Sequence, residues 1–181
     1  MEKGVRLGKS LGGVRLGLVA YADSDWANDT DDRKSVSGGA LFIDGNLVSW
    51  LSRKQNMVCT STAEAEVHAI MEVVHRVDAV KSLVGELGQL VGIRLDNQSD
   101  VDVPIILSDN QPGLDAIRAK RGRNKHYDIK VKFIAERIQR GDFVLQKISS
   151  SANIADVFTK PLRRVRFQSL TSLFLMSANS K

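Results

Sequence analysis

The stretch LGLVAYAD, residues 16–23, is a short apolar run that ends in a carboxylate. Such a continuous run is typical of a strand that is buried on both faces of a sheet. Three further carboxylates stand in comparable settings along the chain, namely Glu66, Asp109 and Asp156. We predict that these acids and Asp23 meet at one end of a single sheet, where they bind metal ions.

The bulk properties are those of an ordinary globular protein. The 181 residues suit one domain with a sizeable core, and 43% of them are hydrophobic against 26% charged. The net charge of +5 fits a polyanionic partner, although many soluble domains are mildly basic. Cys59 is the only cysteine, which excludes an intrachain disulfide and fits a reducing compartment. The chain has no apolar run of about 18 residues and no signal peptide at its start, so we expect no membrane association.

The sequence divides into three expected segments. Residues 1–15 are Gly-rich and basic, as in a linker, the tail of a preceding domain or an artificial extension. Residues 16–160 are expected to form the domain itself. Residues 161–181 are an amphipathic C-terminal tail, with a docking stripe formed by Phe167, Leu170, Leu173 and Phe174.

Residues 40–51 predict a β-hairpin. The turn is Asp44-Gly45-Asn46, whose residue types favour the backbone of tight turns. Ala40–Ile43 and Leu47–Leu51 are the expected flanking strands, and Met57–Cys59 is a candidate extension of the strand region.

A long helix follows, and its periodicity singles out one acid. Ser61 and Glu64 form a capping box at its start, and we expect the helix to run to Leu87 and stop at Gly88. At about 100° per residue, Glu66 lies on the apolar face. That face comprises Ala63, Glu66, Ile70, Val73, Val77 and Val84, and the opposite face carries Glu64, His68, His75, Ser82 and Glu86. A buried carboxylate is costly unless it is paired or bound to a cation, so Glu66 is the candidate ligand, whereas Glu64 faces water or loops.

The second half of the chain alternates strands and helices. Residues 88–103 have the composition of a long polar loop. Asn153 is placed to cap the last core helix, in which Asp156 takes the third position. The other predicted elements are a strand over Pro104–Ser108 that leads to Asp109, a helix over Gln111–Ala119, a basic loop over Lys120–His126, a helix over Tyr127–Gln139 and a strand over Phe143–Ile148.

This order of elements predicts a mixed sheet. A hairpin followed by strands with crossover helices joins an antiparallel half to a parallel half. Ligands of such folds collect at the carboxyl ends of the parallel strands, where Asp23 and Asp109 are expected. Hard cations such as Mg²⁺ prefer oxygen ligands, and two-metal phosphodiester hydrolysis needs several carboxylates on separate rigid elements.

Each acid also has a simpler structural interpretation. Asp23 fits a turn residue after a strand, and Glu66 fits an ion pair inside the core. Asp109 and Asp156 fit the N-terminal turns of helices, where acids are common. The joint pattern, in this order of elements, is more specific than any single member.

The histidines, the cysteine and the basic loop have similar alternatives. His68 and His75 lie on the polar face of the long helix and fit a surface pair better than a zinc site. His126 fits local hydrogen bonding, and Cys59 fits a small core residue. The basic loop fits either a solvated surface or a nucleic-acid contact.

Five blocks of sequence, spread over about residues 16–162, stand out together. They are YADSDWANDTDDRKSVSG, SWLSRKQNMVCTSTAEAEVHAI, LSDNQ, NKHYDIKVKFI and NIADVFTKPL. In this order they strongly resemble the ribonuclease H domain of copia-type LTR retrotransposons, and five such blocks are a highly specific match.

The resemblance implies an α/β, ribonuclease H-like fold with a five-stranded mixed sheet flanked by helices. It also implies an endonuclease that uses two Mg²⁺ ions, for which Mn²⁺ can substitute, and that cuts the RNA strand of RNA–DNA hybrids. By position, Asp23 matches the first-strand aspartate, Glu66 the first-helix glutamate, Asp109 the aspartate of the DNQ block and Asp156 the last-helix aspartate. These four residues are therefore the expected catalytic, metal-binding set.

The resemblance also suggests substrate contacts and partners. Gln111 stands where related enzymes contact the minor groove of the hybrid, and Ser24 is a second candidate for reading 2′-hydroxyls. In the basic loop, Arg121, Arg123 and Lys125 are candidates for phosphate contacts. The expected protein partner is the reverse transcriptase domain of the same polyprotein. The expected location is the cytoplasm, in virus-like particles, with the nucleus as the alternative.

Two departures from cellular ribonucleases H affect the expected activity. The loop before the last aspartate, SSSAN, lacks the histidine that many of them carry, which favours slow turnover. There is little room between Ala119 and Tyr127 for a basic protruding helix, so the basic loop is a partial substitute.

Two other functions fit the same fold. One is a non-catalytic module that binds hybrid or scaffolds a reverse transcriptase, and the presence of all four acids argues against it. The other is a DDE-type integrase, which needs its last acid on a late helix, so Glu66 on the first helix argues against that reading.

Overall fold

The computed structural model describes residues 16–27, 33–90 and 102–174. Its centre is one five-stranded sheet in the order β3-β2-β1-β4-β5. The strands are β1 (Leu18–Asp25), β2 (Val36–Ile43), β3 (Asn46–Lys54), β4 (Ile105–Ser108) and β5 (Val144–Lys147). β1, β2 and β3 pair antiparallel, whereas β4 pairs parallel with both β1 and β5. The predicted mixed sheet, with its antiparallel and parallel halves, is confirmed.

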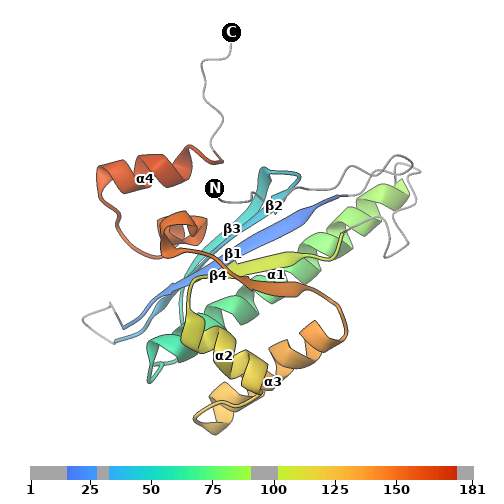
Figure 1. Ribbon diagram of the computed structural model, residues 1–181. Helices are drawn as coiled ribbons and strands as arrows, with labels where there is room; N and C mark the ends of the chain where they lie inside the picture. Colours follow the sequence, from blue (N-terminus) through green and yellow to red (C-terminus); the bar gives the residue numbers. More distant parts are fainter. Residues whose placement is uncertain (1–15, 28–32, 91–101, 175–181) are drawn as a thin grey trace.

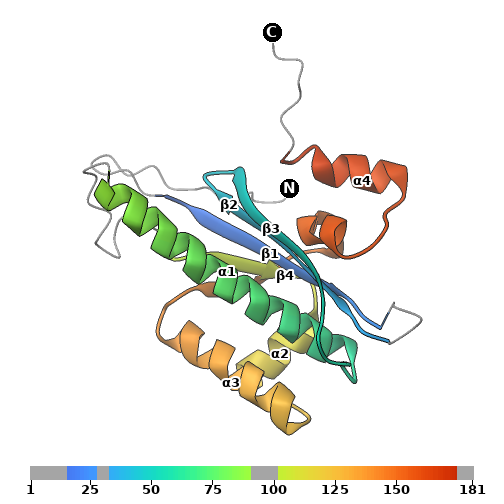
Figure 2. The same ribbon diagram turned by 180° about the vertical axis from the view of Figure 1, so that it is seen from behind.

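The helices lie on both sides of this sheet. The 29-residue helix α1 (Thr62–Leu90) crosses one face, and Figure 2 shows it in front of the sheet. α2 (Gln111–Ala119) and α3 (Lys125–Gln139) lie beside α1, below the sheet in Figure 1. The short 3₁₀ turns η1 (Ser150–Ala152) and η2 (Ile154–Phe158), with α4 (Arg164–Thr171), lie on the opposite face. No helix among the described residues is both long enough and apolar enough to cross a membrane.

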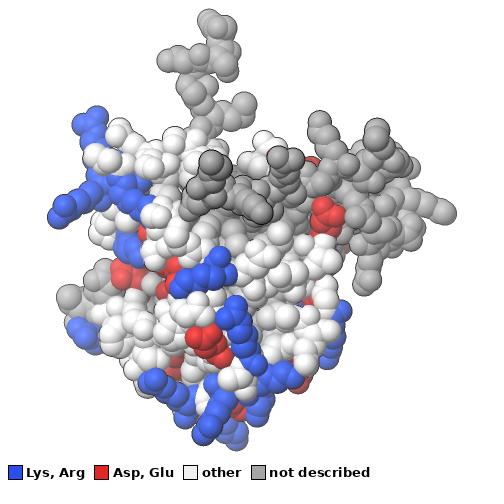
Figure 3. Space-filling model, in the orientation of Figure 1, with Lys and Arg blue, Asp and Glu red and all other residues white. Residues whose placement is uncertain are grey.

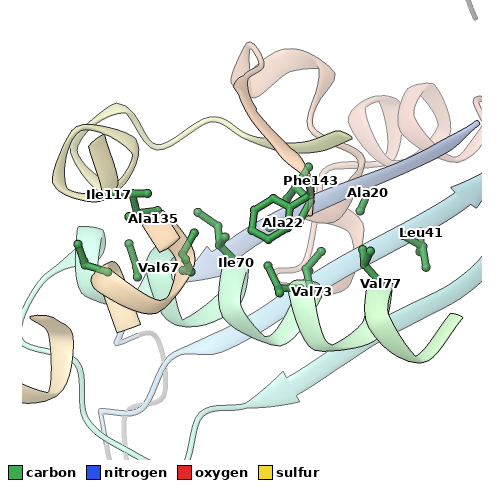
Figure 4. Close-up of a cluster of buried hydrophobic side chains, with 14 of the residues drawn as sticks. Ala20, Ala22, Leu41, Val67, Ile70, Val73, Val77, Ile117, Ala135 and Phe143 are labelled. Carbon is green, nitrogen blue, oxygen red and sulfur yellow. The ribbon is translucent and has the colours of Figure 1, made fainter. Parts of the chain in front are cut away.

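The main core fills the space between the sheet and the helices α1 and α3. Leu18, Ala20 and Ala22 contribute one face of β1, and the apolar face of α1 packs against them (Figure 4). Burial of this apolar surface is the main stabilising contribution in a domain of this size. The core therefore fixes the position of β1 relative to the start of α1.

The other face of β1 is only partly covered, which corrects the predicted burial on both faces. Val19 and Tyr21 are half-buried there. Tyr21 packs there against a smaller cluster of Ala40 and Phe42 from the neighbouring strand β2 and Ile154 from η2, and the ring of Phe174 packs against that of Phe42. The remaining space is a pocket of about 320 Å³ lined by Val19, Tyr21, Phe42, Gly45, Ile105, Leu107, Ile154 and Leu173. The short elements η2 and α4 are too small to cover the sheet as α1 does.

The hairpin forms as predicted but with a tighter turn. Asp44 and Gly45 both have positive φ, 48° and 81°, which is the signature of a two-residue hairpin turn. Asn46, expected in the turn, is already the first residue of β3. The Asp44 carboxylate also accepts a hydrogen bond from the Gly17 amide at 2.9 Å, which fixes the chain where it enters β1.

Met57–Cys59 does not extend the strand region, contrary to the prediction. The pairing of β2 with β3 ends with a hydrogen bond from the Gln55 backbone amide to the Ser35 carbonyl. The buried Gln55 side chain then donates to Ser37 Oγ and to the Ala65 carbonyl, so it turns the chain toward α1. Cys59 is buried, as predicted for a small core residue.

Helix boundaries differ from prediction in two places. α1 continues through Gly88 to Leu90, because a glycine only lowers helix propensity unless it adopts a left-handed conformation. α3 begins at Lys125 rather than Tyr127, because Asn124 caps it by accepting a hydrogen bond from the Tyr127 amide. The predicted loop over residues 88–103 lies mostly outside the described residues, as do the predicted linker 1–15 and the end of the tail.

Candidate metal centre

Asp23 and Asp109 lie side by side because of the strand register. The last parallel pair between β1 and β4 is Ala22 with Ser108, so each aspartate comes one residue later on neighbouring strands. Asp23 was expected to end its strand, but β1 continues to Asp25 along β2. Asp23 nevertheless follows the last contact with β4, which places it at the carboxyl end of the parallel half.

Glu66 reaches the same point from α1. It is the fifth residue of the helix, and the apolar contacts of the main core hold that end of α1 against β1. One carboxylate oxygen from each of Asp23, Glu66 and Asp109 lies within 4.8 Å of the other two. Asp23 and Glu66 are 2% and 6% exposed. The structure therefore brings together three of the four predicted acids.

Burial and mutual repulsion act on these carboxylates. Burial raises the pKa of Glu66 well above its usual value, and the charges of Asp23 and Asp109 raise it further. Burial also raises the pKa of Asp23 to about 6, against the opposing effects of Thr159 and Lys160. Glu66 Oε2 is buried and has no hydrogen-bond partner among the described residues. An all-oxygen cluster with an unpaired buried oxygen fits a hard divalent cation, which would offset the repulsion.

Asp156 lies next to the cluster rather than in it. It sits on η2, which is a 3₁₀ turn rather than the predicted α-helix, although Asn153 caps it as predicted through the Ala155 amide. The ammonium group of Lys160 lies 2.8 Å from Asp156 Oδ1 and 3.4 Å from Asp23 Oδ2. Asp156 and Asp23 thus already share one positive charge, that of the Lys160 side chain.

Three residues of this centre were missed by the sequence analysis as site residues. Asn153 donates to Asp109 Oδ1 at 3.0 Å and to the Ala22 carbonyl at 3.1 Å, so it orients Asp109 as well as capping η2. The Thr159 hydroxyl donates to Asp23 Oδ2 at 2.5 Å. Thr159 and Lys160 follow Asp156 three and four residues later. On a helical turn this spacing places them near Asp156, so the sequence could have indicated both as site residues.

Comparison with known proteins finds similarity to retrotransposon polyproteins. The retrovirus-related Pol polyprotein from transposon RE2 of Arabidopsis thaliana is 35% identical over 161 residues, which is 88% of this chain and 10% of that polyprotein. The transposon Ty1-NL2 Gag-Pol polyprotein of Saccharomyces cerevisiae is 30% identical over 161 residues, 87% of this chain and 9% of the polyprotein. This chain is a homologue of retrotransposon Pol polyproteins. It spans about a tenth of the length of these relatives, and no protein-family model matches it.

The solved structures agree on the architecture. LC11-RNase H1, isolated from compost, matches with a TM-score of 0.54 and 14% identity, over 79% of this chain and 92% of that one. RNase H1 from Halobacterium salinarum matches with a TM-score of 0.51 and 16% identity, over 80% and 94%. The chain has the ribonuclease H fold. The predicted fold class and the predicted resemblance are both confirmed.

Glu64 is buried in this ribonuclease H fold, which corrects the expectation that it faces water or loops. It is 3% exposed, because its carboxylate turns back to accept hydrogen bonds from the Thr60 amide and hydroxyl. Asn124 also donates to it at 3.3 Å. Burial alone would raise the pKa of Glu64, but these hydrogen bonds outweigh it and hold the pKa below its usual value. Glu64 is therefore paired with neutral donors, away from the three-acid cluster.

The basic loop of the ribonuclease H fold is attached near the start of α1. Asn124 links it to Glu64, and the Gly122 amide donates to Asp128 at 2.9 Å. Arg121, Arg123 and Lys125 are all exposed. Figure 3 shows Lys and Arg side chains gathered at the lower end of the molecule, where α3 begins. The three residues predicted to contact phosphates are thus all accessible to solvent, within one short segment of the chain.

The other two predicted substrate contacts differ in exposure. Ser24 is buried directly after Asp23, so only a closely approaching group can reach it. Gln111, on the first turn of α2, is half-buried, and its side-chain amide donates an exposed hydrogen bond to Asp115 Oδ1 at 2.7 Å. An exposed bond of this kind exchanges readily for a bond to a ligand.

The histidines are not the surface pair that was predicted. His75 is exposed, but His68 is half-buried, and burial lowers its pKa to about 4. Glu72 Oε1 lies 3.7 Å from His68 Nδ1, beyond hydrogen-bond distance. Among the described residues, the only group of three or more His, Cys, Asp or Glu side chains close enough to share a metal ion is the cluster of Asp23, Glu66 and Asp109.

Proposed function

We propose that this chain is a metal-dependent endonuclease that cuts the RNA strand of RNA–DNA hybrids during reverse transcription. The cluster of Asp23, Glu66 and Asp109 carries the proposal, because it places two buried carboxylates and one half-buried carboxylate at one point of a ribonuclease H fold. The retrotransposon homologues support it, since an element of that kind must remove RNA from hybrids to complete its DNA. LC11-RNase H1, which shares the fold, has been solved with an RNA/DNA hybrid.

The acids would hold two divalent cations, Mg²⁺ in the first instance and Mn²⁺ as a substitute. Asp23, Glu66 and Asp109 are the ligands proposed for one ion, and Asp156 joins Asp23 for the other. When bound, the ions would activate water and neutralise the departing 3′ oxygen. The chain itself contributes fixed positions, because the acids stand on separate packed elements and Asn153 and Thr159 hold two of them by hydrogen bonds.

Substrate recognition would fall to different residues. RNA is distinguished from DNA by its 2′-hydroxyls, which line a wide and shallow minor groove. Gln111 can both donate and accept there, two residues after Asp109, with Ser24 as a closer contact. Arg121, Arg123 and Lys125 would hold backbone phosphates, which fixes register without reading sequence. The reverse transcriptase domain of the same polyprotein is the proposed protein partner, in cytoplasmic virus-like particles.

The test is a cleavage assay on four labelled substrates. We expect an RNA–DNA hybrid to be cut in its RNA strand with Mg²⁺ or Mn²⁺, leaving a 3′-hydroxyl and a 5′-phosphate, and not with EDTA. Duplex DNA, duplex RNA and single-stranded RNA should remain intact. The Asp109→Asn variant should be inactive, whereas Glu136→Gln, which changes an exposed acid on α3, should cut like the parent. Efficient cutting of duplex DNA, or equal cutting of single-stranded RNA, would contradict the assignment.

A hybrid with a single 2′-deoxy nucleotide beside the scissile phosphate sharpens the test. If 2′-hydroxyls are read, cleavage at that position should fall while neighbouring positions are still cut. Unchanged cutting at the substituted position would mean that the chain does not recognise the RNA strand by its sugars.

A further inference from the structure

Arg166, on the first turn of the C-terminal helix α4, contacts Asp156 beside the metal centre. Its Nη2 lies 3.0 Å from Asp156 Oδ2. The same guanidinium donates to the carbonyls of Ser150 and Ser151 in η1. One side chain therefore connects α4 both to η1 and to η2, the 3₁₀ turn that contains Asp156.

The two carboxylate oxygens of Asp156 contact different positively charged side chains. Oδ1 contacts Lys160, which also contacts Asp23, so Oδ1 is the oxygen turned toward the acid cluster. Oδ2 contacts Arg166. A carboxylate held at one oxygen by a planar guanidinium has little freedom to rotate, because the guanidinium is itself fixed by the two carbonyls. The contact to Arg166 thus fixes the orientation of the Asp156 carboxylate, with one oxygen at Arg166 and the other at Lys160.

The backbone under Asp156 is held independently of Arg166. η2 packs so closely on β2 that a Cβ added at Gly38 would lie 2.4 Å from Thr159 Cγ2 and 2.9 Å from the Ala155 carbonyl oxygen. Asn153 is fully buried and bonded to Ala22. Arg166 is therefore not needed to hold the turn on the sheet, and its particular contribution is to the Asp156 side chain.

α4 also has its own attachment to the domain. Leu170 is buried, and just after the helix the ring of Phe174 packs against those of Phe42 and Phe158, with centroids 6.3 and 6.2 Å apart. Phe167 and Leu173, the other members of the predicted docking stripe, remain exposed. Because the aromatic contacts are separate from Arg166, α4 should stay docked when that side chain is changed.

We propose that Arg166 is a positioning residue for Asp156, and that α4 therefore belongs to the metal centre. The inference rests on the proposed function, since it concerns the second cation that Asp23 and Asp156 would share. Arg166 keeps Asp156 Oδ2 occupied and leaves Oδ1 directed at Asp23, where a divalent ion can replace the charge of Lys160. Residues that orient a metal ligand in this way typically change metal affinity about 10–100-fold when they are removed.

The test is a titration of the full chain with Mn²⁺, in which free Mn²⁺ is measured by electron paramagnetic resonance. We expect two bound ions in the parent. In Arg166→Ala the second ion should bind about 10–100-fold more weakly, while the first, held by Asp23, Glu66 and Asp109, keeps its affinity. Arg166→Lys should be intermediate, because lysine restores the charge without the planar fork. Arg164→Ala, an exposed change on the same helix, should titrate like the parent.

Several outcomes would overturn the proposal. They are an Arg166→Ala variant that binds both ions with parental affinity, a variant that binds the second ion more tightly, and a parent that binds fewer than two ions. Circular dichroism checks that each variant is folded, and if Arg166→Ala does not fold, Arg166→Lys against Arg164→Ala decides by the same criterion. A parent that binds two ions yet leaves hybrid uncut would contradict the proposed nuclease function without affecting the role of Arg166.

Discussion

Two glutamates on the first turns of α1 have opposite surroundings although both are buried. Glu64 accepts hydrogen bonds from Thr60 and Asn124, whereas Glu66 faces Asp23 and Asp109. The helical moment identified Glu66 correctly as the acid on the sheet side. Its prediction that Glu64 faces water or loops was wrong, because the burial of Glu64 comes from the preceding loop folding back and from Asn124, 60 residues away.

We expect Glu66→Gln to abolish hybrid cleavage and Glu64→Gln to retain most of it. Glu66→Gln removes a ligand charge, and it should also stabilise the metal-free protein by relieving repulsion. Glu64→Gln should destabilise the fold by about 1.5–3 kcal/mol, the range for hydrogen bonds to a charged group. Cleavage assays and thermal melting of both variants measure these effects. Equal losses of cleavage would mean that the two acids have the same role.

Cys59 provides a pH-dependent prediction that does not involve the metal centre. Burial, with a smaller effect from the Glu64 charge, raises the pKa of the thiol from 9.0 to about 11. Between these values the folded chain retains a proton that the unfolded chain has lost, so stability should fall as pH rises through this window. Urea unfolding at pH 8, 9.5 and 10.5 measures the fall, and Cys59→Ala should reduce it. A Cys59→Ala variant with the parental slope would assign the effect to another group.

At the scale of elements, the strands and long helices were predictable because their signals are local. The apolar run before Asp23, the Asp-Gly turn and the stripe on α1 each specify one element from neighbouring residues alone. The short turn η2 was predicted as an α-helix, because a five-residue segment capped by Asn153 has the same sequence signal whether it forms an α-helix or a 3₁₀ turn. The contacts of Asn153, Thr159 and Lys160 with β1 join residues more than 130 positions apart, and the contact of Asn153 with Asp109 spans 44 positions, so no local pattern encodes these contacts.

The basic loop is the element for which we expect a salt-dependent effect. Each phosphate contact releases counterions, so affinity for the hybrid should fall with salt, and each lost contact should reduce the slope of log K against log salt by about 1. We expect the combined change Arg121→Ala, Arg123→Ala and Lys125→Ala to reduce the slope by about 2–3. The test is to measure the affinity for the hybrid at several salt concentrations between about 50 and 200 mM.

The matched control for the loop is Lys81→Ala, which removes a positive charge from the later part of α1. It should leave the slope unchanged, because it lies about 15 residues, or roughly 22 Å of helix, beyond Glu66. If the triple variant keeps the parental slope, the basic loop is a solvated surface and phosphates are held elsewhere.

At the scale of the whole molecule, the fold gathers three carboxyl groups at one point, two of them buried, and their mutual repulsion should be visible in the stability of the protein. Divalent cations that bind only the folded state stabilise it by mass action. With Mg²⁺ about 100-fold above its dissociation constant, we expect the melting temperature to rise by about 5–10 °C. The Asp109→Asn variant should melt higher than the parent without Mg²⁺ and gain little when it is added. Identical shifts in the parent and in this variant would show that Mg²⁺ acts at another site.

The spread of the centre along the chain has a consequence for synthesis. The contact between Asp23 and Lys160 spans 137 residues. At about 5–20 residues per second, a ribosome needs roughly 7–27 s to make the intervening chain. For most of that interval the nascent chain carries Asp23, and then Glu66 and Asp109, without Asn153 or Asp156, and Arg166 is made only after Lys160. The metal centre can therefore be completed only late in translation, and a copy that ends prematurely in β5 keeps Asp23, Glu66 and Asp109 but lacks Asp156 and the residues that hold it.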